Sequence, residues 1–293
     1  MEGMRRSRWL ARLAATLTVG MAGAAVAASA PAQAGIVFQS HVVASWGFNS
    51  DGDLGDGTTT DRSLYGDIKV ANDVVQVAAG YYFGLALRSD GTVWAWGDNG
   101  SGQLGDGTTT DRSTPGRVLG PDGVVTQVAA GAMSLALLSD GTVWEWGGDW
   151  LIPVPVPGLT GVTKISTGST FNLALRSDGT VWAWGNNDHG QLGNGTTVST
   201  MTPVKVTGLS HVTGIAAGYN AAVATATNGI LALKSNGTVL AWGSNQGGQL
   251  GIGSKAPVTG PVQVTGLTAA TQVAAGGRSF SLAVHTVPYL AGL

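Results

Sequence analysis

Cysteine is absent from the 293-residue sequence, and only 11% of the residues are charged. Without thiols there can be no disulfide framework, cysteine nucleophile or thiolate metal site, so an exported form must be stabilised by packing. Hydrophobic residues make up 43% of the chain, which also contains 47 glycines and ten tryptophans. This composition is typical of a globular β-protein with many tight turns.

Motifs that carry catalysis are also missing. The sequence has no Gly-x-Ser-x-Gly elbow and no phosphate-binding loop of the Walker type. The four histidines, at positions 41, 189, 211 and 285, lack the spacing of metal ligands. Asp51, Asp53 and Asp56 resemble a calcium loop, but the third carboxylate comes one residue late and the other repeats lack these acids, so we favour a turn. We predict no catalytic residue, no cofactor and no metal site.

The first 34 residues have the layout of a secretory signal. A start with four arginines precedes an apolar stretch over 13–28 and a small-x-small cleavage site, Ala32-Gln33-Ala34, before Gly35. The alternative is a buried or membrane-spanning helix. Without residues 1–34 the chain keeps 11 basic and 16 acidic side chains, a net charge of about −5. We therefore expect a secreted, extracellular protein of residues 35–293 that binds neither nucleic acid nor an anionic membrane.

A repeat organises the remainder of the chain. Trp-Gly pairs begin at Trp46, Trp96, Trp146, Trp184 and Trp242, spaced 50, 50, 38 and 58 residues apart. Each complete unit contains a Val-rich segment ending in Ala-Ala-Gly or a variant of it, an apolar strand, an Asp-Gly or Asn-Gly turn and a Trp-containing strand. Repeats of this length indicate a solenoid or a propeller.

The local patterns within one unit predict its strands and turns. The Asp-Gly pairs predict type I′ hairpins, in which both central residues have positive φ. Alternation places Trp94 and Trp96 on one side of their strand, and we expect these rings to pack between sheets; the alternative is a ligand platform. For Glu145, which replaces Ala in its Trp strand, we expect a solvent-facing position.

The units also differ at two places. A long glycine-rich loop follows most Trp-Gly pairs, but the unit after Trp146 replaces it with a shorter segment containing Trp150. The long 58-residue interval is explained by an insertion near 219–233, whose Asn228-Gly229 pair predicts an extra hairpin.

The combination of GQLGDGTTT, Ala-Ala-Gly followed by Leu-Ala-Leu, and SDGTVWAWG resembles the regulator of chromosome condensation repeat, over about residues 42–284. The resemblance implies an all-β propeller of four-stranded blades, commonly seven. This chain has about five repeats, and Phe83, Phe171 and Phe280 stand where the family often has His. The first unit holds only a Trp strand and the last lacks one, so we expect the N- and C-terminal segments to pair and close the ring; a truncated ring or one completed by an oligomer is the alternative.

Residues that vary where the scaffold repeats are the candidates for recognition. Around the Ala-Ala-Gly turns and the shortened loop they are Tyr81, Tyr82, Met133, Trp150, Tyr219, Asn220 and Arg278. Several of these types are enriched at protein interfaces, so we predict a non-enzymatic propeller that binds a protein partner through one loop-bearing face. A distant similarity to secreted bacterial propellers that inhibit β-lactamases implies inhibition as a specific case. The alternatives are a carbohydrate-binding or hydrolytic propeller with a polar site at its central opening, and a cell-surface spacer.

Overall fold

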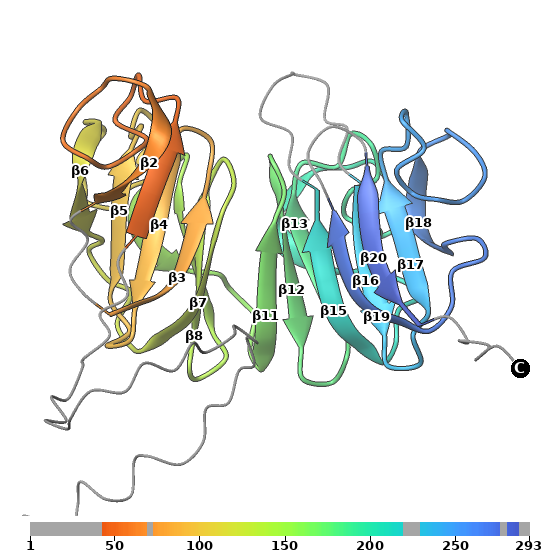
Figure 1. The fold of residues 1–293 in the computed structure, drawn as a ribbon. Helices are drawn as coiled ribbons and strands as arrows, with labels where there is room; N and C mark the ends of the chain where they lie inside the picture. Colours follow the sequence, from red (N-terminus) through yellow and green to blue (C-terminus); the bar gives the residue numbers. More distant parts are fainter. Residues whose placement is uncertain (1–42, 69–72, 219–228, 276–279, 287–293) are drawn as a thin grey trace, which may run out of the picture. The chain divides into compact units, whose positions relative to one another are not determined.

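The computed structural model describes residues 43–68, 73–218, 229–275 and 280–286, all of which lie in one compact unit, Ser40–Leu293. They form twenty β-strands (Figure 1). This part of the chain holds no helix long and apolar enough to cross a membrane. The predicted secretory segment 1–34 and the candidates Tyr219, Asn220 and Arg278 lie outside the described residues.

Four sheets contain four antiparallel strands each, hydrogen-bonded in sequence order, and are named blades I to IV. Blade I consists of β3 (Val74–Ala79), β4 (Phe83–Arg88), β5 (Val93–Gly97) and β6 (Arg112–Arg117). Blade II consists of β7 (Val125–Ala130), β8 (Ser134–Leu138), β9 (Val143–Gly147) and β10 (Trp150–Pro155). Blade III consists of β11 (Val162–Thr167), β12 (Phe171–Arg176), β13 (Val181–Gly185) and β14 (Thr200–Lys205). Blade IV consists of β15 (Val212–Ala217), β16 (Gly229–Lys234), β17 (Val239–Gly243) and β18 (Val258–Gln263).

Two further sheets have two strands each. The N-terminal half-blade consists of β1 (Val43–Gly47) and β2 (Arg62–Ile68), and the C-terminal half-blade of β19 (Ala270–Ala275) and β20 (Ser281–His285). Together the six sheets have the strand content of five four-stranded blades, which confirms the predicted blade architecture. Among the described residues β1 pairs with β2 and β20 with β19, but β1 and β20 do not pair, so closure of the ring within one chain stays a prediction.

The turns between the second and third strands differ from the predicted type I′. In blade I, Gly91 has a φ of +80° while Asp90 is not among the residues with positive φ. Gly91 N donates to Arg88 O at 2.9 Å, and Arg88 N donates to Thr92 O at 3.0 Å. This pattern is a type I turn followed by a left-handed glycine. Asp90 instead acts through its side chain, because its Oδ1 accepts hydrogen bonds from Thr92 N and Thr92 Oγ1.

Apolar cores lie between consecutive sheets. The core between blades I and II joins Leu85 and Leu87 of one blade to Val128 and Trp146 of the next, and each of these residues is at most 2% exposed. Equivalent clusters lie at the other interfaces between neighbouring sheets. The Trp of the Trp-Gly pair is almost fully buried in each complete blade, which confirms the predicted packing of these rings between sheets: Trp96, Trp146, Trp184 and Trp242.

Glutamine side chains join the innermost strands of neighbouring blades. The side-chain amide of Gln76 donates to Val128 O and accepts from Val128 N, both at 2.9 Å. Gln127 makes the same pair of bonds with Ile165, both at 3.0 Å. The Gln of the Gln-Val-Ala-Ala-Gly segment therefore fixes the register of one blade against the next.

The insertion near 219–233 is described only from Gly229 onward. Gly229 is the first residue of β16 and pairs with Gly243, as Phe83 pairs with Gly97 in blade I. The expectation that Gly229 lies in an extra hairpin turn is therefore wrong, since its backbone belongs to the second strand of blade IV.

Candidate functional site

The Ala-Ala-Gly turns and the Trp-Gly loops lie at the same end of the blades. This follows from strand direction, because β4 begins opposite the residue where β5 ends, with Phe83 paired to Gly97. Backbone bonds join the two segments directly, from Asp98 N to Tyr82 O at 2.7 Å and from Asn186 N to Thr170 O at 2.8 Å. We call this end, made of the Ala-Ala-Gly turns and the segments after Trp-Gly, the loop face.

Successive turns on the loop face are bonded to one another. Tyr81 N donates to Gly131 O at 3.0 Å, and Ala132 N donates to Ser169 O at 3.2 Å. The turns of blades I, II and III therefore form one continuous row. This row brings the variable residues after three Ala-Ala-Gly positions side by side, although about 90 residues of sequence separate its ends.

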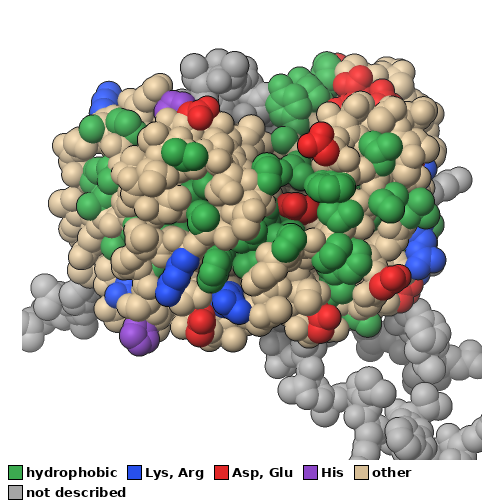
Figure 2. All heavy atoms as spheres, turned by 180° about the vertical axis from the view of Figure 1, so that it is seen from behind, with side chains coloured by type: hydrophobic (Ala, Val, Ile, Leu, Met, Phe, Trp, Pro, Cys, Tyr) green, Lys and Arg blue, Asp and Glu red, His purple; other side chains and the backbone are tan. Residues whose placement is uncertain are grey.

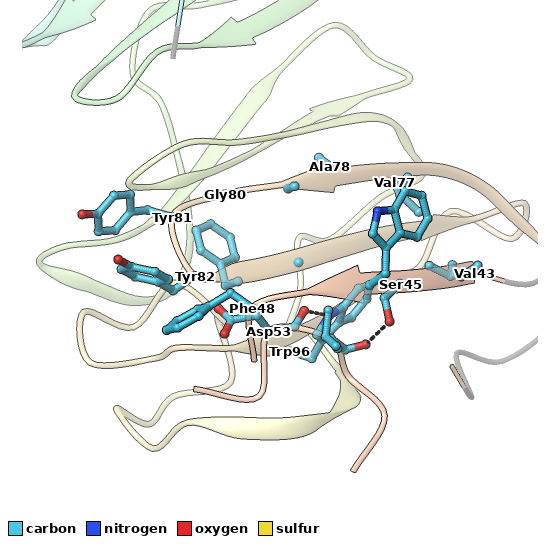
Figure 3. A pocket seen from close by; sticks show the side chains of 16 residues that line it. Val43, Ser45, Phe48, Asp53, Val77, Ala78, Gly80, Tyr81, Tyr82 and Trp96 are labelled. Carbon is cyan, nitrogen blue, oxygen red and sulfur yellow. Dashed lines mark hydrogen bonds between the residues drawn. The ribbon is translucent and has the colours of Figure 1, made fainter. Parts of the chain in front are cut away.

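Three aromatic side chains gather at the blade I end of this row. The rings of Tyr81 and Tyr82 meet edge to face with centroids 4.4 Å apart, and Phe48 of the N-terminal half-blade lies 6.0 Å from Tyr82 (Figure 3). Phe48 is 57% exposed, Tyr81 39% and Tyr82 42%. Tyr82 has a φ of +63°, a backbone conformation that is uncommon and costly for a large side chain. We call Phe48, Tyr81 and Tyr82 the aromatic cluster.

A cavity of about 460 Å³ opens beside the aromatic cluster, between β1 and the first two strands of blade I (Figure 3). Its wall is mainly apolar and includes Trp46, Val77 and the half-buried carboxyl group of Asp53. Burial raises the pKa of Asp53, backbone N–H groups partly offset this effect, and its Oδ1 has no hydrogen-bond partner. Aromatic rings beside a carboxylate can hold an aliphatic or cationic side chain.

The hydroxyl groups of the tyrosines share this electrostatic environment. The hydrogen bond with Tyr81 raises the pKa of Tyr82, and the negative charges of Asp51 and Asp53 act in the same direction. The phenol of Tyr82 therefore stays neutral in the physiological pH range and serves as a hydrogen-bond group, not as an anion.

Met133 and Trp150, the other predicted site residues within the described part of the chain, fall on the loop face but outside the aromatic cluster. Met133 lines a small cleft of about 70 Å³ together with Thr170 and Met201. Trp150 is 46% exposed and opens β10, whose next residue, Leu151, accepts a hydrogen bond from Gly107 N at 3.0 Å. The structure therefore groups Tyr81 with Tyr82 and places Met133 and Trp150 further along the same end of the blades.

The long loops are built on a buried asparagine that sequence reasoning did not single out. In blade I, Asn99 is fully buried; its Nδ2 donates to Thr108 O and Thr110 O, and its Oδ1 accepts from Leu104 N. Equivalent asparagines hold the other long loops: Asn49, Asn187 and Asn245. Their recurrence two residues after the Gly of each Trp-Gly pair that precedes a long loop is the signal that could have revealed them.

Asp56, the third residue of the calcium-like pattern, takes part in this loop structure. Its Oδ1 accepts from Thr58 N and Thr58 Oγ1, and Arg62 lies 3.4 Å from its Oδ2. These contacts lower the pKa of Asp56, and the hydrogen bond from the Thr58 hydroxyl has the largest effect. Asn194 makes the same contacts with Thr196 in blade III, so an uncharged amide fills this position equally well.

Glu145 is buried, which corrects the expectation of a solvent-facing side chain. Only 5% of its surface is exposed, and its Oε2 accepts a hydrogen bond from Trp184 Nε1 at 2.7 Å. The equivalent indoles of Trp96, Trp146 and Trp242 donate instead to a backbone carbonyl of the preceding long loop, at 2.8 to 2.9 Å. Blade II lacks that loop, so the carboxylate of Glu145 replaces the missing carbonyl. Burial raises the pKa of Glu145.

Four-stranded antiparallel sheets that pack face to face, with their loops collected at one end, define a β-propeller. The chain belongs to the RCC1-like domain family, whose pattern it matches over residues 24–287. It is 26% identical to human WBSCR16, with a TM-score of 0.72, and the match covers 83% of this chain and 67% of that protein.

Yeast structures give similar values. The chain is 28% identical to Prp20p from Saccharomyces cerevisiae, a protein studied for its binding to Gsp1p and histones, with a TM-score of 0.68 and coverage of 81% of this chain and 62% of that one. It is 25% identical to yeast RCC1 (Prp20) bound to Kap60, with a TM-score of 0.69 and coverage of 88% and 68%. The chain thus spans about two thirds of these relatives, and the yeast propellers are proteins that bind other proteins.

Proposed function

We propose that this chain is a secreted, non-enzymatic propeller that binds a protein partner on its loop face. The observation that carries the proposal is the aromatic cluster at the rim of an apolar cavity that also holds the Asp53 carboxyl group. Half-exposed, rigid aromatic side chains are the type of residue that dominates binding energy at protein interfaces.

The chemistry of this cavity indicates what part of a partner it accepts. Its wall is mainly apolar, and the acidic groups near it are Asp51 and Asp53. We therefore expect a partner segment that inserts an aliphatic or basic side chain against Tyr82 and Phe48, where a cation gains from both the rings and the carboxylates. Met133 and Trp150, which lie further along the loop face, extend the contact.

Nucleic acid is not the expected partner. The chain has a formal net charge of −2, and the described side chains on the face in Figure 2 present scattered Lys and Arg residues without a continuous basic patch. Binding to phosphates needs such a patch.

Affinity capture with the wild type, the double variant Tyr81→Ala/Tyr82→Ala and the control Tyr65→Ala tests the proposal. Tyr65 is 73% exposed on β2 and lies outside the aromatic cluster, so it controls for the loss of a surface tyrosine. We expect a captured protein whose affinity falls more than about tenfold in the double variant and is unchanged in the control. Equal retention by all three proteins would refute the assignment.

The finer parts of the proposal have their own measurements. Unchanged hydrolysis by a panel of β-lactamases in the presence of micromolar protein would exclude inhibition of those enzymes. Binding to arrayed glycans, or turnover of glycoside substrates, would favour the carbohydrate alternative. Export predicts a mature N-terminus at Gly35, which N-terminal sequencing of protein from the culture medium would detect.

A further inference from the structure

The two half-blades are complementary parts of one blade. In blade I the strands run from β3 and β4 on the inside to β5 and β6 on the outside. The C-terminal half-blade repeats the sequence pattern of the two inner strands, and the N-terminal half-blade that of the outer two. By alignment with blade I, β1 is the strand that would pair with β20.

Trp46 on β1 is the clearest sign that a contact is unsatisfied. It occupies the position of Trp96, Trp146, Trp184 and Trp242, which are at most 5% exposed, yet it is itself 64% exposed. In blade II the ring of Trp146 lies against Gly105 and Val118 of blade I. The approach is so close that a Cβ atom added to Gly105 would lie 2.7 Å from the ring. Trp242 lies in the same way against Gly193 and Val206.

The site that would receive Trp46 is present at the other end of the row of blades. A cavity of about 540 Å³ is lined by Leu250, Gly251 and Val264, the counterparts of the residues that hold Trp146 and Trp242. A Cβ atom added to Gly251 would meet Val264 but no indole ring. No Trp in the described part of the same chain therefore occupies the position that Trp146 and Trp242 take beside Gly105 and Gly193.

The polar group for an indole is also in place. In blade II, Gln103 O accepts hydrogen bonds from both Ser134 Oγ and Trp146 Nε1, each at 2.9 Å. At the C-terminal half-blade, Gln249 O already accepts from Ser281 Oγ at 2.8 Å. The register of the complete blades pairs Ser134 with Trp146, so the same register would pair Ser281 with Trp46.

The apolar surfaces match as well. Phe280, Leu282 and Val284 are 51%, 62% and 56% exposed, whereas their counterparts Phe83, Leu85 and Leu87 are at most 3% exposed. In blade I these counterparts pack against Val128 of the next blade, which is only 1% exposed. Val77 is the equivalent residue of blade I, and it is 55% exposed because no such side chains of the described residues cover it. Gln272 is exposed at the position from which Gln76 and Gln127 bridge to the next blade.

We propose that β1 and β2 of one copy complete the blade begun by β19 and β20 of a second copy, with Trp46 in the Leu250–Val264 cavity and Gln272 bonded to the backbone of Val77. Among the described strands β1 and β20 do not pair and extended contacts link only consecutive sheets, so we assign the partner edge to another molecule. The contact is heterologous, because two different edges meet, and it allows chains to join end to end. Trp46 and Val77 also line the cavity beside the aromatic cluster, so this contact and the insertion of a loop-face partner into that cavity exclude each other.

Cysteine cross-linking tests the contact in the full chain, which has no other cysteine. Ala44 and Ala283 correspond to Trp94 and Ala86, which are paired in blade I. Ala44→Cys and Ala283→Cys are prepared as separate single variants with different tags, mixed and treated with a short thiol cross-linker. We expect a mixed dimer, and none when Val198→Cys, exposed on a loop, replaces either variant.

The double variant Ala44→Cys/Ala283→Cys separates the proposal from closure within one chain. A cross-link formed only inside the double variant, at monomer mass, would overturn the proposal in favour of a closed ring, and no cross-link in either experiment would overturn it as well. In a second measurement, analytical ultracentrifugation, Trp46→Ala should weaken self-association by more than about tenfold, while Trp150→Ala should leave it unchanged.

Discussion

The bond between Glu145 and Trp184 gives the sharpest quantitative prediction. Trp184→Phe removes the indole N–H and leaves a carboxylate that is 5% exposed without its partner. A hydrogen bond to a charged group contributes about 1.5–3 kcal/mol, and the unpaired buried acceptor adds to the cost. The matched control is Trp242→Phe, whose indole donates to the neutral carbonyl of Gln191 at 2.9 Å and should lose about 1 kcal/mol of hydrogen bonding.

The side-chain amide of Asn172 also faces this indole. Oriented to satisfy both of its polar atoms, it places its oxygen 3.1 Å from Trp184 Nε1. Asn172 therefore shares the N–H with Glu145, but it does not provide a donor for the carboxylate. The loss in Trp184→Phe should accordingly depend on the charge of Glu145.

Glu145→Gln isolates that charge. Because burial raises the folded-state pKa of Glu145 above the ordinary value of 4.5, the ionised carboxylate disfavours folding. The favourable contribution of the protonated form is complete below pH 4.5 and is lost as pH rises through the folded-state pKa. Glu145→Gln should therefore be at least as stable as the wild type at pH 7.5, and this advantage should vanish as pH falls toward 4.5.

Urea unfolding of the four proteins and of the double variant Glu145→Gln/Trp184→Phe, at pH 7.5 and at pH 5, is the assay. In the Glu145→Gln background the cost of Trp184→Phe should fall toward that of Trp242→Phe. Equal costs for Trp184→Phe and Trp242→Phe in the wild-type background, with no dependence on pH, would refute the assigned role of Glu145.

Three further predictions concern the loops and turns. Asn99→Ala should lower the free energy of unfolding by about 1–3 kcal/mol, because it leaves the buried backbone groups of the blade I loop unpaired. The same change should make that loop the first site of limited proteolysis, and unchanged proteolysis would contradict this role. Gly195 has a φ of +84°, and a Cβ atom added there would meet no atom within 4 Å, so only the backbone conformation opposes a side chain. Gly195→Ala should therefore lower stability in thermal unfolding by about 1 kcal/mol, and Gly195→Asn by less, because Asn adopts positive φ more readily. Equal losses would point to a cause other than backbone conformation. Thr180→Val should raise the pKa of Asp178 in a carboxyl NMR titration, since the Thr180 hydroxyl is the main cause of its lowering. The stability that Asp178 contributes is present above pH 3.8 and is lost as pH falls through its lowered pKa, so Thr180→Val should reduce this acid sensitivity.

Much of the scaffold follows from the sequence because each unit repeats the same strand and turn motifs. The Trp strands, the Ala-Ala-Gly segments and the long loops could be placed from periodicity, and the burial of the Trp rings follows from their recurrence. The turn type was wrong because a left-handed glycine alone closes the hairpin, with the Asp side chain bonded to the following Thr. Sequence shows the Asp-Gly pair but not which of the two residues takes positive φ.

The candidate site was predicted only in part. Variation at the turns pointed to Tyr81 and Tyr82, but Phe48 and Asp53 come from another sheet, and only packing places them beside the tyrosines. Glu145 was misplaced for a related reason: its environment depends on an indole 39 residues away and on a loop that its own blade lacks.

The sequence by itself determined the number of units, the strands within each unit and the residues available for the loop face, since these depend on local pattern and on the period of the repeat. The tertiary structure decided which turns lie side by side, which carboxyl groups are buried and which edges stay unpaired. Those properties arise from contacts between neighbouring blades, where a side chain meets residues about 40 to 50 positions away, and a single unit cannot specify them.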